Sequence, residues 1–130
     1  MATFLSALID ASPQAFRLVN QTTGQLIADR LLPAFDSKTR NAGLLRHQSL
    51  PPGTAMIIAP SNAIHTFFMK FPIDVVFVAR NGDVVKTRSA LMPWRIAAAW
   101  RAHAVIELAA GALAHSPVRS GDRLHIVKAA

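Results

Sequence analysis

Short runs of alternating apolar and polar residues dominate the chain, and turn residues separate them. Residues 64–85, IHTFFMKFPIDVVFVARNGDVV, show this pattern most clearly. Within them Asn81-Gly82 stands between two apolar runs, which is a strong hairpin signal because a two-residue type I′ turn needs positive φ at both central positions. We therefore predict a hairpin that joins residues 75–80 to residues 84–88.

The same reasoning predicts further short strands. Residues 16–20 and 25–29 flank Thr22-Thr23-Gly24 and are typical of a first hairpin. The other candidate strands are residues 55–59, 64–70, 73–80, 84–88, 105–108 and 123–127. Residues 94–101 are ambiguous, because their alanines favour a helix although strands surround them. Many short strands at this spacing indicate a mainly β fold, either a sandwich or a barrel.

One helix is predicted ahead of the second group of strands. Asp36 or Ser37 can cap it, because a side-chain oxygen there satisfies a free N–H of the first turn. A helix from this cap to about His47 would place Arg40, Leu44 and His47 on one face. The expected fold class is therefore mainly β, with one or two short helices.

Length and composition set limits on the class of protein. The 130 residues fit a single domain, in which we expect residues 1–12 to form a loosely packed N-terminal segment. The chain has no Cys, which excludes disulfides and Cys-ligated zinc. The net charge of +7 comes from scattered cations, so we interpret it as a solvated basic surface. No run approaches the ~18 apolar residues that span a bilayer. The first ten residues lack the cationic start of a secretory leader, so we expect a cytoplasmic location.

The candidate chemistry lies mostly in residues 64–78. In an extended strand His65 would share a face with Phe67 and Met69, so we expect a buried or half-buried histidine. Asp74 begins an apolar strand and needs hydrogen-bond donors, from backbone N–H groups or from a cation such as Lys70. The functional alternative is a small polar pocket of His65, Lys70 and Asp74, with Met69 among the candidate binding residues. The predicted core residues in this region are Phe67, Met69, Val76 and Phe77.

Weaker candidates lie elsewhere in the chain. Arg40 and Arg46 could bind an anion from the predicted helix. Trp94, Arg95 and Trp100 could form a stacking surface for a sugar or a base, although packing within the core is the simpler interpretation.

The remaining acidic and histidine side chains carry simpler interpretations. Glu107 and Asp122 precede or follow turns, which they are expected to cap through backbone N–H groups. The four other histidines, His47, His103, His115 and His125, show no spacing typical of metal ligands, so no metal and no cofactor are predicted.

Five sequence blocks, in order, carry a resemblance to a known family. They are Arg-x-x-Gly-Leu at 40–44, Phe-x-Met-Lys at 67–70, Pro-x-Asp-x-x-Phe at 72–77, Glu-Leu-x-x-Gly at 107–111 and Gly-Asp at 121–122. With them the chain resembles domain-of-unknown-function family 192. The resemblance implies a compact, jelly-roll-like β domain without an established activity. Many relatives place polar residues between the Met-Lys pair and the Pro, whereas here only Phe71 intervenes, so a site on that loop is not carried over.

Three classes of function follow from these observations. We favour a non-catalytic accessory domain that binds a protein partner or a small, anionic ligand, because no nucleophile is paired with a base. The alternative is a small enzyme of hydrolase or lyase type, in which Asp74 or His65 acts as general base and Lys70 or an arginine stabilises negative charge. Binding to nucleic acid or another anionic surface is the third class, and it requires a continuous basic stripe.

Overall fold

The computed structural model describes Leu5, residues 15–44 and residues 47–129. Within these ranges the chain forms ten strands and two short helices. The strands belong to three separate sheets, and none of these sheets closes into a barrel. The predicted mainly β class with short helices is therefore confirmed. Of the expected loose N-terminal segment only Leu5 lies within the described residues, and its side chain is buried.

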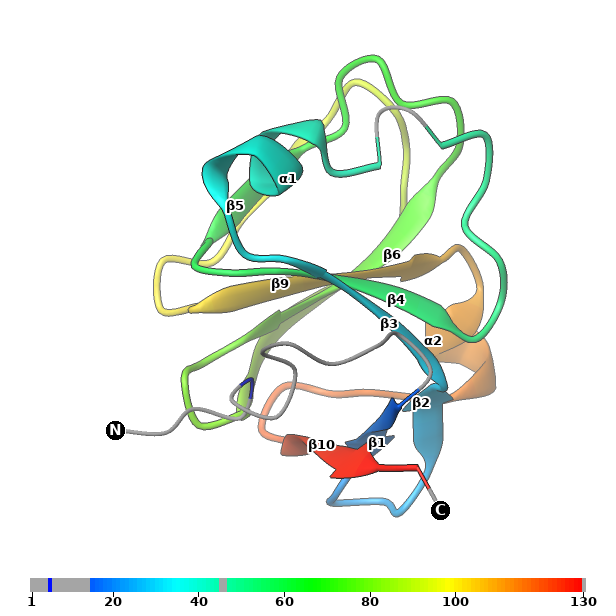
Figure 1. The fold of residues 1–130 in the computed structure, drawn as a ribbon, viewed down its shortest axis with the longest axis vertical. Helices are drawn as coiled ribbons and strands as arrows, with labels where there is room; N and C mark the ends of the chain where they lie inside the picture. Colours follow the sequence, from blue (N-terminus) through cyan, green and yellow to red (C-terminus); the bar gives the residue numbers. More distant parts are fainter. Residues whose placement is uncertain (1–4, 6–14, 45–46, 130) are drawn as a thin grey trace.

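A five-stranded sheet forms the middle layer of the molecule (Figure 1). Its strands, in spatial order, are β3 (Arg30–Ala34), β4 (Thr54–Ile58), β9 (Ala104–Ala109), β6 (Ile73–Val78) and β7 (Val84–Leu91). The sequence pattern did not predict β3, which pairs in parallel with β4 at one edge of the sheet. An edge position suits Pro33, because proline has no N–H to donate to a neighbouring strand.

Smaller elements cover the two faces of this central sheet. On one side lies a three-stranded sheet of β10 (Leu124–Lys128), β1 (Phe16–Asn20) and β2 (Leu26–Ala28). On the other side lie the helix α1 (Ser37–Ala42) and a two-stranded ribbon of β5 (Ala63–His65) and β8 (Ile96–Ala98). Figure 1 shows these two layers below and above the central sheet. The predicted first hairpin, β1 with β2, is confirmed.

The central strands are apolar on both faces because each face packs against its own core. Along β6, Val76 and Val78 pack in the core that faces the three-stranded sheet. Their neighbours Val75 and Phe77 pack into the second core, toward α1 and the β5–β8 ribbon. Alternation along a strand sends successive side chains to opposite faces, so a strand between two cores is apolar throughout. Of the four core residues predicted in this region, only Phe67 is half-buried instead of buried.

The hairpin between β6 and β7 is confirmed, but its turn differs from the predicted two-residue type. The N–H of Gly82 donates to the carbonyl of Ala79 over 3.0 Å, and the N–H of Ala79 donates to the carbonyl of Asp83 over 2.8 Å. Gly82 has a φ of 96°, whereas Asn81 keeps a negative φ. A three-residue loop that ends in a left-handed glycine gives this geometry. Asn81 instead accepts the N–H of Asp83 through its side chain.

Two predicted elements, the first helix and the strand at residues 64–70, are shorter than expected. The first helix ends at Ala42, because Gly43 adopts a positive φ of 48°, so Arg40, Leu44 and His47 do not share a helical face. The predicted strand 64–70 stops at His65, and the chain then turns with Phe68 at a φ of 66°. A second short helix, α2 (Ala112–His115), follows β9. Among the described residues, neither helix has the length and apolar character that crossing a bilayer requires.

Candidate functional site

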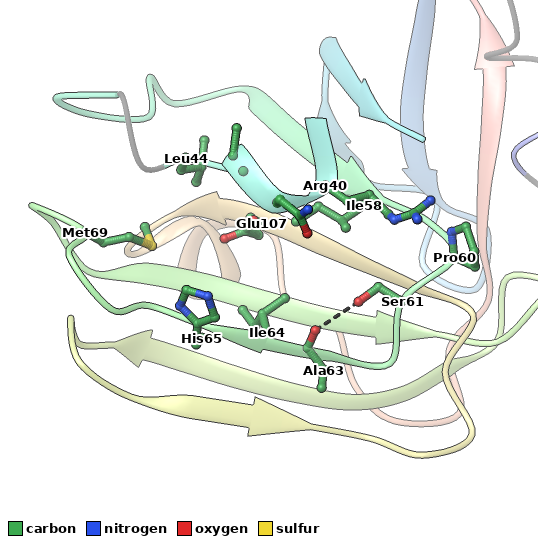
Figure 2. A pocket seen from close by; sticks show the side chains of 13 residues that line it. Arg40, Leu44, Ile58, Pro60, Ser61, Ala63, Ile64, His65, Met69 and Glu107 are labelled. Carbon is green, nitrogen blue, oxygen red and sulfur yellow. Dashed lines mark hydrogen bonds between the residues drawn. The ribbon is translucent and has the colours of Figure 1, made fainter. Parts of the chain in front are cut away.

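A pocket of about 410 Å³ opens between α1, β5 and the central sheet (Figure 2). The end of α1 and the residues after it form one wall, and β5 with the chain leading into it forms the opposite wall. The side chains of Leu44, Ile58, Ile64 and Met69 make part of the lining apolar. The polar groups on the lining are Arg40, Asn41, Ser61, His65 and Glu107. We call this space the Glu107 pocket.

Glu107 lies on β9, at the floor of this pocket. Its side chain is on the same sheet face as Met56 and Val75, its partners across β4 and β6. The residue is only 3% exposed, and Figure 2 shows its carboxyl group between Leu44 on one side and Ile64 and His65 on the other. None of the described residues donates a hydrogen bond to this carboxyl group. It is therefore a nearly buried polar group that lines the pocket.

Burial without a partner changes the acidity of Glu107. Loss of solvation raises the pKa of its carboxyl group from 4.5 to about 7, because the charged form is the one that burial penalises. The group therefore exists at neutral pH in both its protonated and its charged form. A carboxyl in this state can donate a hydrogen bond, accept one, or exchange a proton with a bound molecule.

The end of α1 forms the roof above this carboxyl group. Asp36 caps the helix by accepting the N–H of Thr39 over 2.7 Å, and Gly43 ends it by donating its N–H to the carbonyl of Thr39. A Cβ placed on Gly43 would lie 3.9 Å from Glu107 Oε1. The positive φ at Gly43 thus turns the chain so that its backbone passes directly over the buried acid.

Asp74, the other buried acid of the central strands, has a different environment. It lies on β6 with its side chain toward the three-stranded sheet, the opposite face of the central sheet from Glu107. Its Oδ1 accepts the N–H of Ala90 over 2.8 Å. Its Oδ2 accepts the N–H groups of Gly111 and Leu113 over 3.1 and 2.9 Å. The predicted donors are therefore backbone groups and not Lys70.

The structure separates the three residues of the predicted polar pocket. His65 lines the Glu107 pocket, but it is exposed and stacks on Phe67 at 4.9 Å between ring centroids. The expectation of a buried or half-buried His65 was wrong, because the strand ends there and Thr66 takes the buried position. Lys70 is exposed and lies outside the lining, and Asp74 is on the far side of the sheet. Their predicted convergence does not occur.

The other predicted binding residues divide between two places. Arg40 and Met69 line the Glu107 pocket, although the Arg40 guanidinium turns back to donate to the carbonyl of Phe35 over 2.9 Å. Trp94 and Arg95 lie outside the pocket, in the loop before β8, and both are exposed. Core packing of Trp94 is thus not observed. Arg46 lies outside the described residues.

Sequence reasoning assigned the wrong role to one of two acids. Glu107 was expected to cap the turn that follows it, but Asp74 accepts the N–H groups of that turn. The available signal was the position of Glu107 inside the apolar run Ala-Val-Ile-Glu-Leu-Ala, which is typical of a strand buried on both faces. For Asp122 the prediction was right, since its Oδ2 accepts the N–H of Arg119 over 2.9 Å.

A larger cavity, of about 620 Å³, opens on the other side of the fold beside β2 and α2. Small and backbone groups such as Gly53, Ala110 and Gly111 make up much of its lining, and it contains no buried ionisable side chain. Within the described residues, no group of three histidine or acidic side chains could hold a metal ion. The Glu107 pocket is therefore the better candidate site.

Comparison with known proteins identifies the family. The pattern of the DUF192 family, described as "Uncharacterized ACR", matches residues 19–126. The chain belongs to this family. The Glu107 pocket is built from its sequence blocks, since Arg40, Gly43, Met69 and Glu107 all belong to the blocks recognised in the sequence. None of the curated proteins compared with this DUF192 chain matches it.

Two solved structures share the fold of this DUF192 protein. One, from Sinorhizobium meliloti 1021, is a protein proposed to be a transcription regulator; it is 23% identical, with a TM-score of 0.74 over 89% of this chain and 96% of that one. The other, from Novosphingobium aromaticivorans DSM 12444, is a protein of unknown function; it is 20% identical, with a TM-score of 0.70 over 85% and 83% of the two chains. At these identities the likeness concerns the fold alone.

Proposed function

We propose that this DUF192 domain binds a small molecule in the Glu107 pocket without chemically changing it. The observation that carries the proposal is the buried carboxyl group of Glu107, which no described residue satisfies. Among the described residues no fully buried polar side-chain atom lacks a hydrogen-bond partner, so the Glu107 oxygens reach the open pocket, where a ligand can supply the donor that the protein does not. A concave, partly apolar pocket with few convergent polar groups and a shifted pKa is typical of ligand sites.

The lining indicates the class of ligand. Glu107 supplies an acceptor on the floor, while Leu44, Ile58 and Ile64 offer apolar walls. A ligand with a hydroxyl or amine donor on a compact apolar body would satisfy both features. An anionic ligand fits less well, because it would meet the Glu107 carboxylate, while the Arg40 guanidinium donates to Phe35 and Ser37.

A binding screen with matched variants tests this proposal. Sugars, amino alcohols and primary amines would be screened by ligand-observed NMR against the wild type, Glu107→Gln, Ile64→Trp and Lys70→Ala. Ile64→Trp fills the pocket from β5, whereas Lys70 is nearby in sequence but outside the lining. A specific ligand should bind the wild type and Lys70→Ala equally. It should lose at least about tenfold in affinity with Glu107→Gln and all measurable binding with Ile64→Trp. Ligands that bind Ile64→Trp as well as the wild type would contradict the proposal.

Catalysis is the second candidate, because a carboxyl with a pKa of about 7 is well suited to general acid–base chemistry. In this version Glu107 exchanges the proton and His65 is the second polar group at the pocket. The version based on Lys70 and Asp74 loses its support, since neither lines the pocket. Chemical turnover of a screened ligand that stops with Glu107→Gln, while binding persists, would favour the enzyme.

A further inference from the structure

A group of exposed apolar side chains lies at one end of the β5–β8 ribbon, outside the Glu107 pocket. Phe68 is 70% exposed, Trp94 is 55% exposed and Ile96 is 66% exposed, and Met92 beside them is also exposed. The rings of Phe68 and Trp94 touch, with 4.6 Å between their centroids. We call these four residues the aromatic ridge. Figure 1 shows the two loops that carry it together at the top of the view.

The fold holds two residues of this ridge in an unfavourable backbone conformation. Phe68 and Trp94 have φ angles of 66° and 67°, a region that bulky residues rarely adopt. Buried Thr66 joins the two loops: its N–H donates to the carbonyl of Arg95 over 2.8 Å, and its carbonyl accepts the N–H of Trp94 over 3.0 Å. Such strain persists only where the surroundings impose it, and it is concentrated at functional positions.

The charged residues that neighbour the ridge in the sequence are cationic. From Val84 to Ile106 the chain contains no Asp or Glu. Of the cations in this range, Lys86 and Arg101 line a separate hollow beside Trp100, whereas Arg95 lies in the loop of the ridge. Arg95 follows Trp94 directly, and Lys70 lies two residues after Phe68; both are exposed. The two acids in residues 61–83 are occupied, since Asp74 is buried on backbone donors and Asp83 pairs with Arg123 at 2.7 Å. The ridge therefore presents apolar groups next to exposed cations.

We propose that the aromatic ridge docks the domain on an anionic lipid surface. Trp and Phe favour the boundary between headgroups and acyl chains, and each nearby Lys or Arg adds about 1 kcal/mol of attraction to anionic lipid. Flat stacking on nucleic acid would not use the aliphatic Ile96 and Met92. Pairing with a second copy would place like charges against each other. This proposal is independent of the ligand proposed for the Glu107 pocket.

The two tryptophans and the absence of tyrosine make the test direct. In a Trp100→Phe variant, Trp94 is the only indole, so intrinsic emission reports on the ridge. Vesicles of phosphatidylcholine with phosphatidylglycerol should shift this emission to the blue, and brominated lipid should quench it. Pure phosphatidylcholine should bind at least about tenfold more weakly, and added salt should weaken binding to the anionic vesicles.

Cosedimentation with the same vesicles tests the residues. Phe68→Ser with Trp94→Ser should weaken binding at least about tenfold. Arg95→Glu should remove most of the preference for anionic lipid. Leu26→Ser is the matched control, because Leu26 is also apolar and 45% exposed but belongs to β2, in another sheet. If the double variant fails to fold, the emission of Trp94 in the Trp100→Phe protein still shows whether the ridge contacts the vesicles.

Three results would overturn the proposal. The first is an unchanged Trp94 emission with anionic vesicles. The second is that the wild type binds oligonucleotides but not vesicles, and that the double variant loses the binding to oligonucleotides. The third is that the protein does not bind vesicles but forms a dimer in sedimentation velocity experiments, and that this dimer depends on Phe68 and Trp94.

Discussion

Leu113, in α2, donates its backbone N–H to Asp74 Oδ2 on β6 over 2.9 Å. This bond, with those from Gly111 and Ala90, ties the turn after β9 and the end of β7 to the start of β6. One carboxylate thus satisfies three N–H groups that have no strand partner. The Pro-x-Asp block of the sequence has a structural reason here, quite apart from catalysis.

Replacing Asp74 by Asn should therefore destabilise the fold. An amide has a single acceptor oxygen, so in either orientation its NH₂ group faces at least one of the three N–H donors. We expect the free energy of unfolding to fall by about 2 to 4 kcal/mol, measured by urea denaturation. Asp29→Asn is the control, because Asp29 is an exposed carboxylate, and it should change stability by about 0.5 kcal/mol or less. An Asp74→Asn protein as stable as the wild type would refute the structural role.

Phe77 provides a test of the core that faces α1 and the β5–β8 ribbon. Its side chain is fully buried among residues such as Val75 and Val105. Truncation to Ala should cost roughly 3 to 5 kcal/mol of unfolding free energy, from lost burial and the cavity left behind. Phe68→Ala removes the same atoms from an exposed position and should cost about 1 kcal/mol or less. Similar losses for the two variants would mean that Phe77 is not in the core.

The pattern of apolar and polar residues along the chain was enough to predict most strands, because the faces of a strand that are buried determine which of its residues are apolar. β3 escaped prediction since it is a short parallel edge strand that contains a proline. The strand expected at 64–70 failed for a different reason. Its alternation continues past His65, but Thr66 bonds to the loop before β8, a contact remote in sequence that no local pattern reveals.

The candidate site was predicted only in part, for a related reason. His65, Met69 and Arg40 were identified from their residue types, and all three line the pocket. Glu107 was missed because a turn follows it, and a carboxylate near a turn usually caps it. Asp74, which lies on β6, caps that turn instead. Which of two buried acids is satisfied depends on tertiary contacts, which a single sequence does not show.

Gly82 closes the β6–β7 hairpin with a φ of 96°. A side chain at this position strains the turn, so Gly82→Ala should lower the unfolding free energy by about 1 kcal/mol or more. Arg80→Ala changes an exposed residue of the same loop and is the control. Thermal melts of both proteins give the comparison. An unchanged melting temperature for the Gly82 variant would show that the turn tolerates a side chain and that its glycine is not required.

Thr66 connects the two loops that carry the aromatic ridge. Its hydroxyl donates to the carbonyl of Met92 over 2.6 Å and accepts the N–H of Arg95 over 2.9 Å. Thr66→Val keeps the shape but leaves both groups unpaired, at a cost of about 1 to 3 kcal/mol in chemical denaturation. The control is Thr87→Val on β7, because the Thr87 hydroxyl bonds to none of the described residues. Equal stability of the two variants would argue against Thr66 as the link between the loops.

Glu107 makes a prediction about pH. Its pKa is raised by burial from 4.5 to about 7 in the folded protein, whereas the unfolded carboxyl keeps the ordinary value. Between these two values the folded state binds more protons than the unfolded state, so stability falls as the pH rises through this window. The fall should be on the order of 3 kcal/mol in the absence of a ligand, and it should level off above pH 7.

Glu107→Gln isolates this effect, because the amide is neutral at every pH and other titrating groups contribute equally to both proteins. The two proteins should be similarly stable near pH 4, and the Gln variant should be the more stable above pH 7. Urea denaturation across that range measures the difference between the two curves. A ligand that donates hydrogen bonds to the carboxylate should reduce the difference at high pH. A constant difference at all pH values would show that Glu107 titrates normally, and the pocket would then lose the buried acid on which its proposed function depends.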